Sequence, residues 1–360
     1  LAVNHAYYLQ TVAGIKDLDG QAAAAYGLYF TTNATAAADT VAPKVLAMSP
    51  PDGSTDVGIN AHVHAQFDEP VNAISLLPDP LQTNYGSLSW SSDNRSVEFV
   101  RHQPYAVNSA VTESVAGVTD LAGNPASAPN SVSFTTGDGP DFTAPQVVDG
   151  TPFNGATNVP VNATIKLRFN EPLDSVSVNA NTTTPLALYS SQDGYLAITV
   201  TLEADGRTIT YVPAQALAVG RLYYVYAYGV KDLAGNVQNA YRTFTTAFAT
   251  DTQGPVVTAT SLADGLTNVP TNAVVAVLFD EPVNEQSLTG IALSLNGSPV
   301  SSTPILSSDG REVTLKFNQP LQANTTYVFT IAAVQDLSGN VLAVNRTVSF
   351  TTGAGTDLTA

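Results

Sequence analysis

Acidic residues recur at matching positions in three stretches of the 360-residue chain. Each stretch holds one Asp ahead of a Pro-containing segment, one or two acids in an F-D-E-P or F-N-E-P tetrapeptide, and the Asp of a D-L-x-G-N pentapeptide. The three sets are Asp39, Asp68, Glu69 and Asp120; Asp141, Glu171 and Asp232; and Asp251, Asp280, Glu281 and Asp336. Gathered carboxylates repel one another unless a cation neutralises them, and Ca²⁺ takes about six to eight oxygen ligands. If the fold brings each set together, the pattern predicts a calcium site.

Two other interpretations of these residues stay open. The D-L-x-G-N pentapeptide is also a good turn, because its Asp accepts hydrogen bonds from nearby amides and its Gly and Asn tolerate the left-handed conformation. Paired carboxylates also form the active sites of glycosidases. Adjacent acids at a strand end point apart, however, and a site copied in every repeat indicates architecture, so we expect no enzymatic activity. The D-x-D-x-D-G spacing of an EF-hand loop does not occur.

The composition narrows the classes of partner. A formal charge of −17 argues against binding to nucleic acid. The absence of cysteine excludes disulfides and thiolate metal sites. The apolar runs are shorter than the roughly 20 residues of a membrane helix, so we expect no membrane insertion of this segment. A hydrophobic fraction of 44% is enough for packed cores.

A repeat of about one hundred residues, the size of one domain, organises the chain. The tripeptide F-T-T closes each unit, at Thr32, Thr136, Thr246 and Thr352. The predicted units are the last two strands of a truncated repeat (1–36), three full repeats (37–138, 139–248 and 249–353), and the start of a linker to a further repeat (354–360). We call the first unit the partial repeat and the next three the first, second and third full repeats.

Alternation of apolar and polar residues predicts strands rather than helices. In the strand before each F-D-E-P or F-N-E-P, the apolar face is predicted to line the core: Val63, Ala65 and Phe67; Ile165, Leu167 and Phe169; Val275, Val277 and Phe279. The other face is expected to meet solvent, so we interpret His62 and His64 as surface residues rather than metal ligands. Val274, Ala276 and Leu278 make this outer face apolar in the third full repeat. If covered, that patch would indicate packing against another domain or subunit.

Several short strands separated by turns over each unit indicate a two-sheet β-sandwich. A Tyr that starts the penultimate strand, tied back to an upstream corner, is typical of Greek-key sandwiches. The sequence offers this pattern as Leu1 with Tyr7, Leu217 with Tyr223, and Leu321 with Tyr327. The first full repeat departs from it, with Tyr105 and Val111 at the two positions, so its corner must be held in another way.

The order of these motifs resembles the bacterial Ig-like domain of the S-layer (SbsA) type. The shared pattern runs through D-x-x-A-P-x-V, T-N-V-P-V-N-A, F-x-E-P, D-G-R, V-K-D-L-A-G-N and F-T-T, and it covers nearly the whole chain. The resemblance implies an all-β protein of tandem Ig-like Greek-key β-sandwiches that form an elongated rod. Such domains occur in S-layer proteins, adhesins and spacer regions of secreted enzymes, which implies an extracellular or bacterial cell-surface location.

We therefore expect a non-catalytic structural segment of a bacterial cell-surface or secreted protein, such as a stalk, S-layer, filament or adhesin. Ca²⁺ at the domain junctions would stiffen it, and we expect no other cofactor. Its partners would be the adjacent repeats of a longer chain and, through self-association, other chains in a lattice or filament. The alternative is a carbohydrate-binding or spacer module of a secreted hydrolase or adhesin. That alternative predicts exposed aromatic residues clustered on one repeat, with Trp90 as a sugar platform rather than a core or edge residue.

Overall fold

Strands dominate the computed structural model, which describes residues 1–11, 14–32, 34, 37–76, 86–128, 130–179, 186–247 and 249–357. The second full repeat is a sandwich of two sheets with strand orders β14-β15-β11-β9 and β10-β17-β16-β12-β13. Its elements are β9 (Val147–Thr151), β10 (Ala156–Val159), β11 (Ile165–Phe169), α2 (Ser175–Asn179), β12 (Leu186–Ser190), β13 (Gly194–Tyr195), β14 (Ile198–Leu202), β15 (Thr208–Pro213), β16 (Leu222–Lys231) and β17 (Val237–Thr246). This crossing of the chain between two sheets is the Greek-key arrangement of Ig domains.

The third full repeat has the same topology, with strand orders β18-β20-β24-β23 and β19-β26-β25-β21-β22. In both repeats a short strand pairs in parallel with the last strand, β10 with β17 and β19 with β26, while the main ladders are antiparallel. The elements are β18 (Val257–Thr260), β19 (Leu266–Val269), β20 (Val275–Phe279), the 3-10 helix η2 (Glu285–Gly290), β21 (Ile291–Leu295), β22 (Ser298–Pro299), β23 (Ser302–Leu306), β24 (Glu312–Phe317), β25 (Thr326–Ile331) and β26 (Arg346–Thr352).

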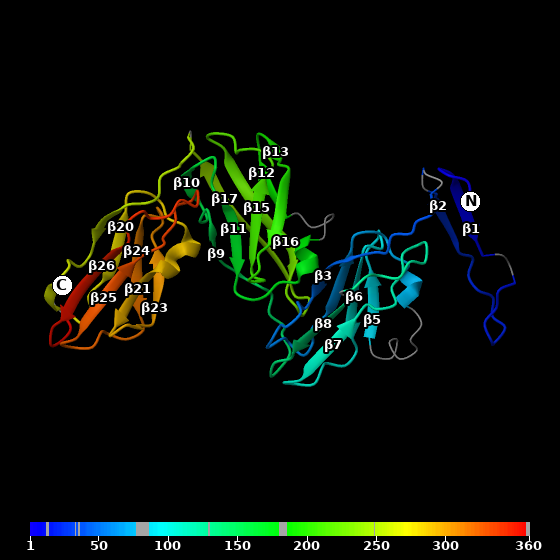
Figure 1. Ribbon diagram of the computed structural model, residues 1–360, viewed down its shortest axis with the longest axis horizontal. Coiled ribbons are helices and arrows are strands. Elements are labelled where there is room, and N and C mark those ends of the chain that lie inside the picture. Colours follow the sequence, from blue (N-terminus) through cyan, green and yellow to red (C-terminus); the bar gives the residue numbers. More distant parts are fainter. Residues whose placement is uncertain are drawn as a thin grey trace.

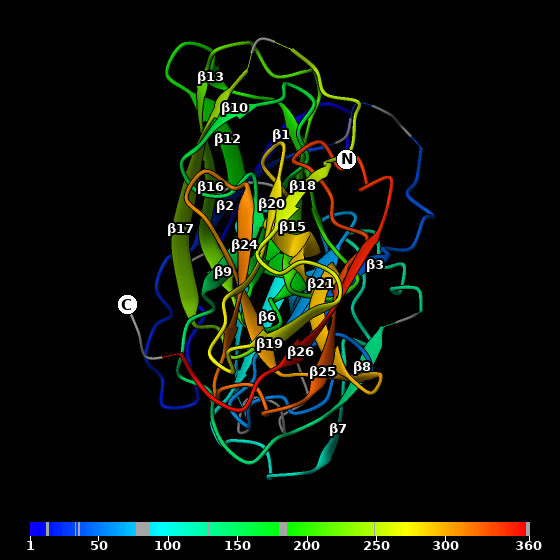
Figure 2. The ribbon, with the colours of Figure 1, turned by 90° about the vertical axis from the view of Figure 1, so that its left-hand side faces the viewer.

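The first full repeat has a four-stranded sheet, β3-β4-β6-β5, opposite the pair β7-β8. Its elements are β3 (Val45–Ser49), β4 (Val63–Phe67), the 3-10 helix η1 (Ala73–Leu76), β5 (Gly86–Trp90), β6 (Ser96–Arg101), β7 (Ala110–Ser114) and β8 (Ser131–Thr135). The partial repeat contributes one antiparallel pair, β1 (Ala6–Gln10) with β2 (Gly27–Thr31). The three sandwiches follow one another along the long axis of the molecule (Figure 1) and overlap when the molecule is turned by 90° (Figure 2).

The predicted core-facing residues of β4, β11 and β20 are buried in all three full repeats, which confirms the alternation argument. Each of these strands is the second in its sheet, between the first strand and β6, β15 or β24. Their apolar faces therefore close against the opposite sheet while their outer faces stay free to meet another domain. Trp90, at the end of the edge strand β5, is partly buried against the core of the first full repeat, which agrees with its interpretation as a core or edge residue.

Three tyrosine corners form as the sequence predicts. The Tyr223 hydroxyl accepts a hydrogen bond from the Ala218 amide (2.9 Å) and the Tyr327 hydroxyl from the Gln322 amide (2.9 Å). Tyr7 makes the same bond to Ala2 (2.7 Å). In the first full repeat, the hydroxyl of Tyr105 instead donates to Glu113 (3.0 Å), and its ring packs edge-on against Phe134. Tyr105, at the position where the other repeats have Leu, thus takes the place of the corner Tyr that Val111 replaces.

Candidate metal centre and repeat junctions

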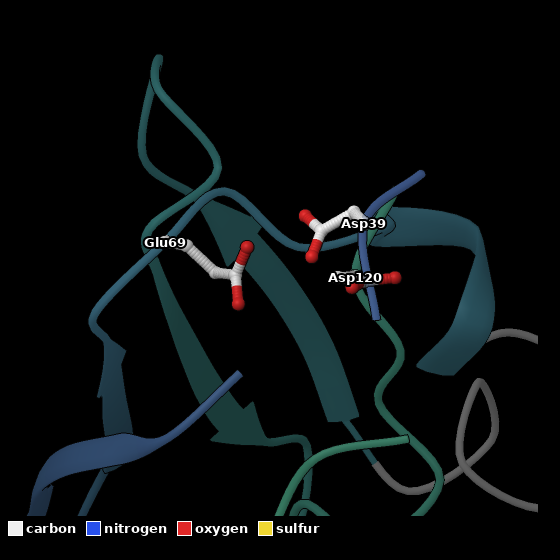
Figure 3. A group of neighbouring side chains, drawn as sticks. All are labelled: Asp39, Glu69 and Asp120. Atoms are coloured by element: carbon white, nitrogen blue, oxygen red, sulfur yellow. The ribbon is translucent and has the colours of Figure 1, made fainter. Parts of the chain in front are cut away.

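Three of the predicted carboxylates meet at the N-terminal end of each full repeat. The trios are Asp39, Glu69 and Asp120; Asp141, Glu171 and Asp232; and Asp251, Glu281 and Asp336. In each trio one oxygen per residue lies within 4.8 Å of the others. Figure 3 shows the first trio converging from a linker, a strand end and a turn. We call these groups the acidic trios.

The turn Asp of each trio is fixed by the backbone of its own D-L-x-G-N motif. Oδ1 of Asp232 accepts the amides of Ala234 (2.8 Å) and Asn236 (2.9 Å), and Oδ2 accepts the Asn236 side-chain amide (2.7 Å). Asp120 and Asp336 make the same three bonds. The turn interpretation is therefore confirmed, and the turn also places a buried carboxylate beside two others.

The linker Asp of the second and third trios is held by the preceding repeat. The side-chain amide of Asn60 donates to the carbonyl of Asp141 (2.7 Å), and the Asp141 amide donates back to Asn60 Oδ1 (2.8 Å). Asn162 and Asp251 repeat this pair of bonds at 2.8 and 3.0 Å. Each of these linker acids is thus attached by its backbone to one repeat, while its carboxylate belongs to the acidic trio of the next.

The Glu of each trio shows that three carboxylates crowd one another. Burial raises the pKa of Glu171 to about 7, with the neighbouring Asp141 and Asp232 adding to the effect. Burial, Asp251 and Asp336 raise the pKa of Glu281 to about 8 in the same way. Oε1 of Glu171 is buried without a hydrogen-bond partner among the described residues. The charged forms of Glu171 and Glu281 are therefore disfavoured beside the other carboxylates of their trios.

Asp68 and Asp280 do not join the acidic trios. Oδ1 of Asp68 accepts the amide of Lys44 (2.7 Å), at the start of the first strand, and Oδ1 of Asp280 accepts the amide of Val256 (2.7 Å). Asn170 holds the corresponding position of the second full repeat and accepts the Gln146 amide at the same distance. The task at this position is to accept one hydrogen bond, which an amide oxygen does as well as a carboxylate. Asn170, which stands in the second full repeat where the other two have Asp, was the sign in the sequence that this position needs no negative charge.

The chemistry of the acidic trios fits a hard cation. All their side-chain donors are carboxylate oxygens, which suit Ca²⁺ and Mg²⁺, whereas structural zinc sites prefer sulfur and nitrogen. Backbone carbonyls of the linker lie beside the first two trios, since the side-chain amides of Asn124 and Asn236 donate to the carbonyls of Asp39 and Asp141 (3.2 and 3.3 Å).

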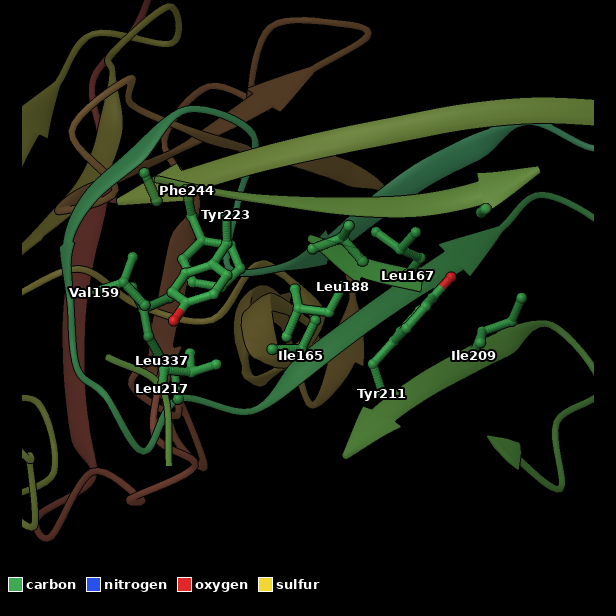
Figure 4. Close-up of a cluster of buried hydrophobic side chains, with 14 of the residues drawn as sticks. Val159, Ile165, Leu167, Leu188, Ile209, Tyr211, Leu217, Tyr223, Phe244 and Leu337 are labelled. Atoms are coloured by element: carbon green, nitrogen blue, oxygen red, sulfur yellow. The ribbon is translucent and has the colours of Figure 1, made fainter. Parts of the chain in front are cut away.

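The Leu of the D-L-x-G-N turn in the second and third full repeats, which we call the junction leucine, packs into the preceding repeat, a role that the sequence analysis did not assign. Leu337 belongs to the third full repeat but is 2% exposed within the core of the second (Figure 4). Leu233 packs in the same way against Tyr105 and Phe134 of the first full repeat. Their carbonyls accept the amides of Thr164 and His62, both at 2.9 Å. The sequence did contain a hint of this packing, because a large apolar residue recurs in a turn that is otherwise mostly polar.

His62 and His64 lie at the first junction rather than on a free surface, which corrects the prediction. His64 Nδ1 lies 2.8 Å from Asp174 Oδ2 of the second full repeat. His62 Nδ1 lies 2.9 Å from Oε1 of Glu98, and Lys231 of the second full repeat contacts both oxygens of Glu98 at 3.1 Å. Sequence periodicity placed both His on the outer face of β4 but could not show that a neighbouring domain covers it.

At the second junction, different charged residues form the contact between the helical turn and the preceding repeat. Oε2 of Glu285, at the start of η2, accepts bonds from Arg242 Nη1 and from the Gly150 amide, both at 3.1 Å. At the first junction, Ser175 at the start of α2 donates to the carbonyl of Met48 in β3 (3.1 Å). In both cases the helical turn after F-D-E-P or F-N-E-P contacts the first strand of the preceding repeat, so the two junctions share one geometry.

The pKa of Glu98 gives the first junction a measurable pH dependence. The hydrogen bond from His62, followed by the charge of Lys231, lowers the pKa of Glu98 from 4.5 to about 2. A lowered carboxyl pKa stabilises the folded state above the unfolded pKa, and this contribution is lost as pH falls through the folded pKa. We expect Glu98→Gln to lower the free energy of unfolding of the first full repeat by up to about 3 kcal/mol at pH 7. The deficit should shrink between about pH 5 and pH 2.

Urea unfolding of wild type and Glu98→Gln across that pH range measures the effect. Glu312→Gln is the matched control, because Glu312 lies in β24, the strand of the third full repeat that is equivalent to β6, but is exposed. A deficit that stays constant with pH would contradict a contribution from the Glu98 carboxylate.

Three stretches of the chain match the family model of the bacterial Ig-like domain, at residues 39–136, 141–250 and 251–352. The chain belongs to this family. A curated bacterial relative, an S-layer protein of Geobacillus stearothermophilus, is 23% identical over 205 residues, which is 56% of this chain and 16% of the relative. The bacterial Ig-like repeats described here thus span about one sixth of the length of that S-layer protein.

Some solved structures are distantly similar to this chain. The N-terminal part of the S-layer protein SbsC is 16% identical, with a TM-score of 0.24, over 58% of this chain and 44% of that one. A chimeric titin Z1Z2 is 13% identical, with a TM-score of 0.22, over 59% of this chain and 98% of that one. Among the described residues, no helix has both the length and the apolar character needed to cross a membrane.

Proposed function

We propose that this chain is a non-catalytic structural segment of a bacterial cell-surface or secreted protein, in which consecutive Ig-like repeats form a rod stiffened by Ca²⁺. The membership of the bacterial Ig-like family and the similarity to an S-layer protein support a structural role at the cell surface. Within such an array the natural partners are adjacent repeats and other chains of a lattice. An adhesin or a stalk would use the same rod to hold a binding domain away from the cell.

The observation that carries this proposal is the way each junction joins two repeats. An acidic trio takes one carboxylate from a linker whose backbone is bound by the preceding repeat. The turn that supplies another carboxylate also inserts its Leu into that same repeat. A cation bound by the trio would therefore hold together the linker, the strand end and the junction turn. Without it, the mutual repulsion of the carboxylates favours opening of the junction.

Distance measurements between spin labels on two repeats test this proposal. The chain has no native cysteine, so labels can be attached at two introduced cysteines. Thr201→Cys places one label at an exposed position of β14, and Lys316→Cys places the other at an exposed position of β24. We expect one narrow distance distribution with excess Ca²⁺ and a broader one with EDTA. Equal widths in both conditions would contradict stiffening by Ca²⁺, and broad distributions in both would contradict the rod itself.

A tyrosine cluster supports a second candidate function, a carbohydrate-binding module. Tyr189, Tyr195, Tyr224, Tyr226, Tyr228 and Tyr241 form contacts of 5.0 to 6.3 Å between ring centroids on the outer face of the β12-β16-β17 sheet. Tyr195 and Tyr241 are the most exposed of these rings. Aromatic rings with a polar tip suit contacts to sugars, which have both apolar faces and hydroxyl groups. A glycan array with wild type and Tyr226→Ala distinguishes this function from a purely structural one.

A further inference from the structure

The tyrosine cluster forms a continuous belt across one sheet of the second full repeat, the middle of the three sandwiches (Figure 1). The rings of Tyr195 in β13 and Tyr189 in β12 have centroids 5.0 Å apart, and Tyr224 of β16 follows at 6.2 Å from Tyr189. Tyr226 lies 6.0 Å from Tyr224 with a nearly parallel ring, and Tyr241 of β17 lies within 6.3 Å of both. Four neighbouring strands, spaced about 4.8 Å apart, make the belt roughly 14 Å long, which is longer than a single sugar ring.

The sandwich itself does not require these rings. Tyr224 and Tyr226 lie one and three residues after the corner Tyr of their repeat. The same two positions are Val328 and Thr330 in the third full repeat, and Thr112 and Ser114 in the first. The positions that alternate with the rings carry the core instead: Tyr223, Val225 and Ala227. Large rings kept on an outer face where smaller side chains serve the fold indicate contact with another molecule.

The hydroxyl groups of the cluster are available to a ligand. The hydroxyls of Tyr211 and Tyr223 bond to the backbone of the second full repeat, each at 2.9 Å, but those of the six cluster tyrosines have no hydrogen-bond partner among the described residues. Burial, followed by the nearby phenol groups of Tyr228 and Tyr195, raises the pKa of Tyr226, so these groups lie close together. Apolar ring surface beside several unbonded hydroxyls suits a sugar, which presents C–H faces and hydroxyl groups together.

The absence of charge on this face selects among glycans. The other outward positions of β12, β16 and β17 are uncharged as well: Ala187, Leu222, Asn239, Thr243 and Thr245. The two basic residues within these strands already have acidic partners at the junctions, Lys231 with Glu98 and Arg242 with Glu285. The chain as a whole carries a charge of −17, which repels an acidic polymer. The face therefore fits a neutral glycan.

We infer that the tyrosine cluster binds a neutral polysaccharide that lies across β13, β12, β16 and β17. A polymer fits better than a single sugar because the belt of rings runs over four strands. The inference rests on the second candidate function proposed above and deepens it by naming the class of ligand and the face that binds it. None of the six rings belongs to an acidic trio, so binding would attach the middle repeat sideways to a glycan layer while the junctions stay intact.

Native electrophoresis of the full chain tests the inference, in gels that contain dextran, a galactomannan or a soluble β-glucan as neutral probes and polygalacturonate as the acidic one. All gels contain EDTA, so that ions at the acidic trios take no part. We expect a neutral polymer to retard wild type and polygalacturonate not to. Tyr226→Ala should raise the apparent dissociation constant at least about tenfold. Tyr226→Phe, which keeps the ring and its packing, should raise it only about threefold.

Thr330→Ala is the matched control, because Thr330 holds the position of Tyr226 in the third full repeat, and it should leave the dissociation constant unchanged. No retardation by the neutral polymers, or equal retardation of wild type and Tyr226→Ala, would overturn the inference. Retardation by polygalacturonate alone, lost in Tyr226→Ala, would overturn it but leave a carbohydrate-binding function in place. A dimer in analytical ultracentrifugation that Tyr226→Ala dissociates, without retardation by glycans, would overturn it in favour of a second copy. The spin-label distances test the rod separately from all these results.

Discussion

Leu337→Asp is expected to lower the free energy of unfolding of the second full repeat by about 3–5 kcal/mol. Leu337 belongs to the third full repeat, yet it is 2% exposed among Val159, Leu217 and Tyr223 of the second. The substitution either buries a carboxylate without a cation or withdraws the turn and leaves that core open to water. In both cases a substitution in the third full repeat destabilises the second.

Urea unfolding with hydrogen exchange resolved by repeat measures this effect. We expect the largest loss of protection in β16 and β17 of the second full repeat and at the Thr164 amide, which binds the Leu337 carbonyl. Leu121→Asp is the matched control, because it makes the same change in the same turn at a side chain that is 73% exposed. It should alter stability by no more than about 0.5 kcal/mol. Equal effects of the two substitutions would contradict the role assigned to the junction leucine.

The effect of Glu281→Gln on the stability of the third full repeat should have opposite signs in EDTA and in Ca²⁺. In EDTA, the substitution replaces one of three carboxylates that lie within 4.8 Å of each other by a neutral amide. The pKa of Glu281, raised to about 8, shows that its charged form is disfavoured in the folded state, so removing that charge should stabilise the third full repeat. With Ca²⁺ at about 100 times its dissociation constant, wild type should gain roughly 2.7 kcal/mol at this site. The variant should lose that gain.

Asp280→Asn is the matched control for the loss of a carboxylate. Asp280 is adjacent to Glu281 in the chain but binds the Val256 amide, and Asn170 already performs this task in the second full repeat. Thermal unfolding should therefore show a full response to Ca²⁺ in Asp280→Asn and a reduced one in Glu281→Gln. If both variants lose the response equally, general surface charge rather than the acidic trio binds the ion.

The repeated sequence contains most of the information about each sandwich and its acidic end. Period-two alternation identified the buried faces of β4, β11 and β20, and three aligned copies separated the fixed apolar face from the variable one. The same repeated motifs predicted that a linker Asp, the acids of the F-D-E-P or F-N-E-P tetrapeptide and a turn Asp belong to one set in each repeat, and all of these except Asp68 and Asp280 meet in the trios. These features depend on contacts within one repeat, so local patterns and a known sandwich order were enough.

The junctions could not be derived in the same way, because they depend on how two domains lie against each other. His62 and His64 had the spacing of an exposed strand face, and only the position of Asp174 in the next repeat shows that the face is covered. Glu98 and Lys231 have no matching charges in the other full repeats, so no pattern shared by the full repeats pointed to them. The junction leucine did recur, and its apolar character in a polar turn was the available signal.

In the proposed rod, Ca²⁺ bound by the acidic trios stabilises the repeats. Thermal unfolding of the full chain in excess Ca²⁺ and in EDTA, at constant ionic strength, tests it most directly. Stabilisation of roughly 2.7 kcal/mol per site should raise the midpoints of the full repeats by roughly 10 °C in Ca²⁺. Identical midpoints in Ca²⁺ and EDTA would contradict the claim and leave the D-L-x-G-N motif as a turn that joins neighbouring repeats without an ion.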